Sequence, residues 1–130
     1  MRGFCLLGDK GSGPHETIGL VTLTLIAKDI EIKEWRYSGG FHALSDILRE
    51  VSSAEAHIRI LTDDGIAAAA RLLCSARNLM VQGEEFVFRA ETLESPVKLE
   101  NGELRLELDV AKTTMSRVLR SQAAGEPALP

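Results

Sequence analysis

The chain is poor in aromatic side chains and carries no surplus of positive charge. Aromatic residues make up 5% of its 130 positions, and the formal net charge at pH 7 is −4. Proteins that bind nucleic acids non-specifically neutralise phosphates with an excess of lysine and arginine, and single-strand binders stack bases on aromatic rings. The composition therefore argues against a strong non-specific nucleic-acid binder, although it allows a metal-bridged or partner-assisted contact.

Cysteines and long apolar segments are also scarce. The two cysteines, Cys5 and Cys74, lie in apolar segments without CxxC spacing, which favours buried free thiols and a reducing compartment. No apolar run approaches the roughly 20 residues that a membrane helix needs. The first residues lack the apolar core and cleavage site of a signal peptide. We therefore expect a cytoplasmic protein with no membrane contact.

What the chain does contain is a regular spacing of apolar residues. Alternation with a period of two predicts strands, and spacings of three and four predict helices. The expected strands occupy residues 2–7, 18–27, 30–37, 57–61, 85–90 and 104–110, and the expected helices occupy residues 41–53, 66–73 and 113–122. Residues 78–84 are expected to form a connection, and Asn101-Gly102 is typical of a tight hairpin turn.

This pattern gives the order β-β-β-α-β-α-β-β-α. It predicts a single α+β domain over residues 1–122, with a mixed or antiparallel sheet and helices packed on it. Residues 123–130 contain two prolines and a glycine, and we expect them to form a flexible tail.

Two carboxylates follow apolar strands and are the first candidates for chemistry. Asp9 comes after the first expected strand and Asp63 after the fourth, so their side chains could meet where strand ends lie together. Mg²⁺ prefers oxygen ligands, and paired metals assist phosphodiester cleavage. Asp46, on the first expected helix, and Asp109, near the end of the last strand, would complete the cluster.

A purely structural reading of the same acids stays open. Asp63 and Asp64 stand where they can cap a helix, and Asp9 stands where a turn begins.

Three segments of the first half carry a family resemblance. They are LLGDKGSGP at residues 6–14, IGLV at residues 18–21 and IRILTD at residues 58–63. Over residues 4–75 the pattern resembles the ribonuclease H-like superfamily, in which a meander, a helix, a fourth strand and a second helix carry acids at strand ends. The resemblance implies magnesium-dependent phosphodiester hydrolysis, with Asp9 and Asp63 as metal ligands. The helical glutamate of the family should fall near Leu44, so Asp46 would replace it and Asp109 would be a distant fourth ligand.

The second half carries a different resemblance. GELRLELD at residues 102–109 runs into MSRVLRS at residues 115–121, and residues 57–121 read β-α-β-β-α. This is similar to the small dimerising subunit of the KEOPS tRNA-modification complex. It implies a non-catalytic scaffold subunit that forms a homodimer and binds the protein subunits of an RNA-processing complex.

The basic residues of the last expected helix are open to two interpretations. Lys112, Arg117 and Arg120 would form its solvated face, or they would contact RNA phosphates. A third possibility for the whole chain is a purely structural interaction domain of no named family.

Overall fold

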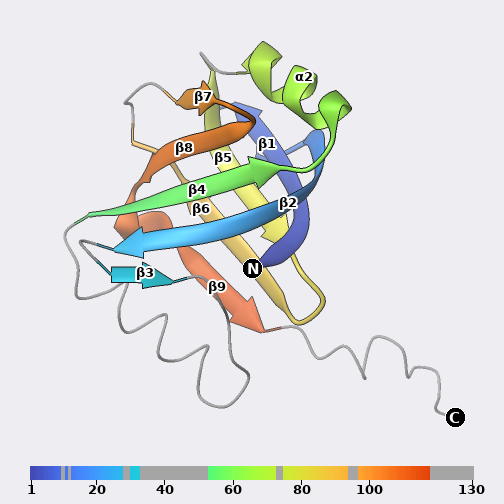
Figure 1. The fold of residues 1–130 in the computed structure, drawn as a ribbon. Helices are drawn as coiled ribbons and strands as arrows, with labels where there is room; N and C mark the ends of the chain where they lie inside the picture. Colours follow the sequence, from blue (N-terminus) through green and yellow to red (C-terminus); the bar gives the residue numbers. More distant parts are fainter. Residues whose placement is uncertain are drawn as a thin grey trace, which may run out of the picture.

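The computed structural model describes residues 1–9, 11, 13–27, 30–32, 53–72, 75–93 and 97–117. Within these ranges it contains nine β-strands, one α-helix and one short 3-10 helix (Figure 1). The strands are β1 (Arg2–Asp9), β2 (Glu16–Ala27), β3 (Ile30–Ile32), β4 (Ala54–Ile60), β5 (Ala76–Gln82), β6 (Phe86–Glu91), β7 (Lys98–Glu100), β8 (Glu103–Leu108) and β9 (Thr114–Arg117). The helices are α2 (Asp63–Leu72) and η1 (Val110–Lys112).

All the strands belong to one sheet, in the order β7-β8-β4-β2-β1-β5-β6-β9, with β3 added beside β2. Every pairing between them is antiparallel. The described part of the chain is therefore mostly strand with one α-helix. The mixed sheet that the sequence pattern also allowed is absent from these residues.

The sheet curls until two strands that are distant in its order meet. Thr92, just after β6, forms a bridge with Leu108 at the end of β8. The amide of Leu93 donates to the carbonyl of Glu107 at 2.9 Å, and the amide of Asp109 donates to the carbonyl of Glu91 at 2.8 Å. Strands β8, β4, β2, β1, β5 and β6 thus surround a common interior.

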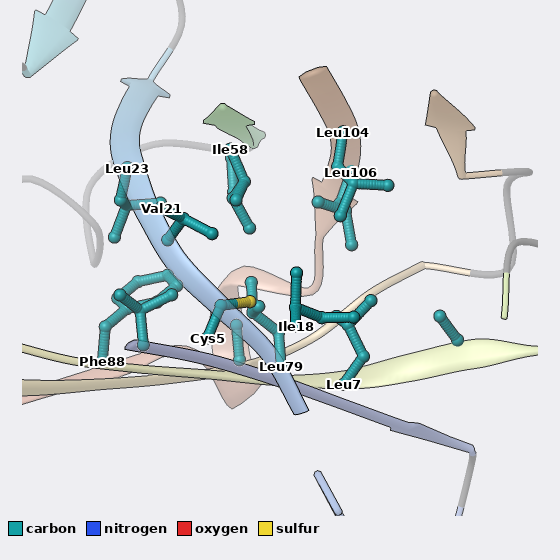
Figure 2. Packing of buried hydrophobic residues seen from close by; sticks show 14 of the residues in the cluster. Cys5, Leu7, Ile18, Val21, Leu23, Ile58, Leu79, Phe88, Leu104 and Leu106 are labelled. Atoms are coloured by element: carbon teal, nitrogen blue, oxygen red, sulfur yellow. The ribbon is translucent and has the colours of Figure 1, made fainter. Parts of the chain in front are cut away.

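That interior holds the hydrophobic core. Inward-facing side chains of all six strands meet there, and the largest of them are less than 2% exposed (Figure 2). They are Leu7, Ile18, Val21, Leu23, Leu25, Ile58, Leu79, Phe88, Leu104, Leu106 and Leu108. The alternation of β8 predicted this inward face correctly, because successive strand residues point to opposite sides of a sheet.

Helix α2 packs on the sheet through small residues. Gly65, Ala68 and Ala69 are its buried positions, and their spacing of three and four places them on one face. A β-carbon built on Gly65 would lie 2.3 Å from the carbonyl oxygen of Ile18 and 2.7 Å from the Ile60 side chain. The absence of bulky groups therefore lets the helix backbone approach β2 and β4 closely.

Two sequence-based expectations for the second half are wrong in the described residues. Thr114–Arg117 is strand β9 and not part of a helix over residues 113–122, because it pairs with β6 and alternates buried Met115 with exposed Thr114 and Ser116. Residues 78–84 are not a simple connection, because most of them belong to β5, which pairs with both β1 and β6. In each case pairing with a distant strand overrides the local pattern.

Several expectations fall wholly or largely outside the described residues. The helix over residues 41–53 lies outside them except for Ser53, which is not helical, and the tail over residues 123–130 lies outside them entirely. The strand over residues 30–37 is described only as Ile30–Ile32. The Asn101-Gly102 turn is confirmed: both residues have positive φ, 51° and 76°, and they join β7 to β8. None of the helices in the described ranges has the length and apolar character needed to cross a membrane.

Candidate functional site

A bulge between β1 and β2 decides which side chains reach the outer surface. The pairing passes from Cys5 opposite Gly19 to Leu6 opposite Thr17, and Gly19 has a φ of 95°. Ile18 and Leu20, two residues apart, would share a face in a regular strand. Instead Ile18 is buried and Leu20 is 49% exposed, because the extra residue reverses the alternation.

The outcome is a row of large apolar side chains on the outside of the sheet. Phe4 of β1 is paired with Leu20 of β2. The amide of Leu61, just after β4, donates to the carbonyl of Leu20 at 3.1 Å. Phe4, Leu20 and Leu61 are 44%, 49% and 43% exposed. We call these three residues the outer apolar row.

One side of this row is basic and partly engaged in ion pairs. Arg2 and Arg59 are exposed and stand two residues before Phe4 and Leu61, respectively. Arg59 Nη2 lies 3.5 Å from Glu103 Oε2, and Glu103 also accepts from Arg105 Nε at 3.1 Å. The other side is acidic, because the exposed residues Asp63 and Asp64 begin α2 directly after Leu61. The surface thus changes from basic to apolar to acidic between Arg59 of β4 and the start of α2.

The two acids expected to bind magnesium follow strands that are not neighbours. Asp9 is the last residue of β1, where its carbonyl accepts from Asn78 Nδ2 at 2.6 Å. Asp63 is the first residue of α2, and both aspartates are exposed. Strand β2 lies between β1 and β4. The two acids therefore do not share the junction of adjacent strand ends on which the magnesium site was predicted.

The other predicted site residues have separate positions. Asp109 caps η1, and its carboxylate accepts from the amide of Ala111 at 3.2 Å. Lys112 Nζ lies 3.5 Å from Glu91 Oε1, an exposed ion pair of modest strength. Arg117 lies on β9 opposite Phe86, whereas Asp46 and Arg120 are outside the described residues.

The described side chains do not assemble a metal site among themselves. Over these ranges there is no group of three or more histidine, cysteine, aspartate or glutamate residues that could hold a metal ion. Magnesium binding and the RNA contacts of the basic residues stay predictions of the sequence.

The one cysteine in the described ranges belongs to the core and not to a reactive centre. Cys5 is free, fully buried on β1, and burial raises the pKa of its thiol to about 12. A thiol that stays protonated is a poor nucleophile and a poor metal ligand.

The outer apolar row was not recognised in the sequence, although one signal for it was present. Gly19 interrupts an otherwise β-branched and apolar strand, and an isolated glycine inside a strand indicates a bulge. The regular alternation assigned to residues 18–27 overlooked that reversal, which moves Leu20 to the surface.

Comparisons with protein-family models, with curated proteins and with solved structures gave no match to this chain.

Proposed function

We propose that this protein is an assembly domain that binds another protein through the outer apolar row. The observation that supports the proposal is the adjacency of Phe4, Leu20 and Leu61, each more than two fifths exposed, across three neighbouring strands. Single apolar residues are common on protein surfaces, but contiguous patches mark interaction sites. Burying apolar area contributes about 25 cal/mol per Å², so covering this row favours association.

The surroundings of the row fit the anatomy of a protein interface. Interfaces combine an apolar, often aromatic centre with a polar rim. Here Phe4 supplies an aromatic ring, and Arg2, Arg59, Asp63 and Asp64 supply charges on both sides. Phe4 and Leu20 lie on strands of the closed sheet, and Leu61 is bonded to the carbonyl of Leu20, which holds the row rigid and reduces the entropy lost on binding.

The KEOPS-like setting is proposed from the β8 segment, residues 102–109, because Thr114–Arg117, where the resemblance expected the start of a helix, is strand β9. In that setting the chain is a scaffold subunit of a cytoplasmic RNA-processing complex, and the binding energy comes from protein contacts and not from the basic residues near the C-terminal end. A reducing compartment suits the buried free thiol of Cys5.

Site-specific photo-crosslinking in the cells that make the protein tests this function. Benzoylphenylalanine in place of Phe4 keeps an aromatic group at the row, and the same residue in place of exposed Thr114 on β9 is the control. We expect a light-dependent protein adduct from position 4 and none from position 114. Equal labelling from both positions, or no adduct from position 4, would contradict the proposal.

A further inference from the structure

We propose that the partner at the outer apolar row is a second copy of this chain, docked about a twofold axis that passes near Leu20. In this arrangement the basic side of one copy faces the acidic side of the other. The inference rests on the proposed function, because it names the protein that the row binds.

The strand directions fix the polarity of the surface. β1 and β4 are both antiparallel to β2, so they run the same way. Arg2 precedes Phe4 and Arg59 precedes Leu61, each by two residues, so both arginines lie on the same side of the row. Asp63 and Asp64 begin α2, and Gly65 of the same turn packs against the carbonyl of Ile18, which precedes Leu20 on β2, so this turn lies on the opposite side of the row.

A surface ordered in this way is complementary to itself. A twofold axis through the middle of the row exchanges its two sides, so apolar side chains meet apolar side chains and Arg2 of each copy approaches Asp63 and Asp64 of the other. Such an isologous contact uses the same patch on both subunits and closes at two copies. Leu20 lies between Phe4 and Leu61 in the row, so the axis passes closest to it.

The charges favour a protein over a nucleic acid at this surface. The chain has a formal net charge of −4, and two exposed carboxylates stand directly beside Leu61. Phosphate groups would be repelled there, and Phe4 is the one aromatic ring of the row. Of the two arginines, Arg59 already pairs with Glu103 of its own chain, which leaves Arg2 as the principal basic contact.

The first test is the mass of the full chain in solution, measured by sedimentation across micromolar concentrations. We expect a concentration-dependent dimer, and we expect Leu20→Ser to weaken it by at least about tenfold, because each dimer loses two apolar side chains. Leu93→Ser is the matched control, since Leu93 is 41% exposed but lies outside the row. An unchanged dimer in Leu20→Ser, or equal weakening by Leu93→Ser, would overturn the inference.

The second test uses charge reversal and is specific to the twofold arrangement. Arg2→Glu sets acid against acid in its own dimer and is expected to be monomeric, whereas Asp63→Lys puts a lysine beside Arg2 but keeps Asp64, so its dimer is expected to be weakened. When the two are mixed, Glu faces Lys at one contact and Arg2 faces Asp63 at the other, so a mixed dimer should form. Asp64→Lys is the substitute if Asp63→Lys weakens α2, which thermal unfolding will show. Failure of the mixed pair to associate would refute the geometry.

Other outcomes separate this inference from the proposed function. A monomeric chain whose position 4 crosslinks to a different protein keeps the function and removes the second copy. A monomeric chain that gives no adduct from position 4 contradicts both the proposed function and the second copy as partner. A monomer that binds a single-stranded uridine oligonucleotide, with binding lost in Phe4→Ser, identifies the row as an RNA surface and also removes both.

Discussion

Alkaline pH is expected to destabilise this protein through a single thiol. Burial of Cys5 raises its pKa from an ordinary value of 9.0 to about 12. Above about pH 9 the unfolded chain loses the thiol proton while the folded chain keeps it, so stability falls with rising pH. The protonated thiol makes its full contribution to folding stability below about pH 9, and that contribution is lost as pH rises to the pKa of Cys5 in the folded protein.

The size of the effect follows from the separation of the two pKa values. Each pH unit above about 9 lowers the folding equilibrium constant by about tenfold, up to the folded pKa. At about pH 11 the loss is about a hundredfold, or about 3 kcal/mol. Domains of this size are stable by about 5–15 kcal/mol, so the change is a measurable fraction of the total.

The assay compares urea unfolding of the protein and of Cys5→Ala between about pH 8 and about pH 11. Both proteins carry Cys74→Ser, so that one thiol at most titrates. Loss of the sulfur lowers the free energy of unfolding of Cys5→Ala by an amount that does not depend on pH. Ionisation of the Cys5 thiol lowers the free energy of unfolding of the parent protein as pH rises, so the gap between the two proteins narrows. A difference that stays constant over the whole range would refute the assignment of Cys5 to the core.

Three further changes test the packing and the sequence-based chemistry. Gly65→Ala is expected to destabilise the protein by at least about 2 kcal/mol in urea unfolding, because the new methyl meets the Ile18 carbonyl. Helix propensity alone favours alanine, so a stabilised variant would contradict the close approach of α2 to the sheet. Leu104→Ala, in the closed interior, should lower the free energy of unfolding by about 2–5 kcal/mol, whereas Leu93→Ala, at an exposed position, should lower it by less than about 1 kcal/mol. Equal losses in the two variants would argue against the core described here. The ribonuclease H-like resemblance predicts magnesium-dependent cleavage of an RNA–DNA hybrid that Asp63→Asn abolishes, and a gel assay in which neither protein cuts would end that prediction.

Local patterns identified much of the described fold. β8 and the interior face of its leucines follow from strict alternation, and the turn before it follows from Asn101-Gly102, whose backbone adopts the positive φ that this pair favours. α2 follows from its helical pattern and its acidic start, and β1, β2 and β4 from their apolar runs. Each of these signals depends on residues within one element, so the sequence alone determines it.

Contacts between distant segments determined the rest. Met115 is compatible with a helix or a strand, and pairing of its segment with β6 selected the strand. Asp9 and Asp63 were expected at one junction, but β2 separates their strands. The outer apolar row exists because a bulge turns Leu20 outward between Phe4 and Leu61. The sequence specifies the spacing of apolar residues within each element, whereas the register of the strands and the choice of neighbouring strands are fixed only when the whole sheet closes.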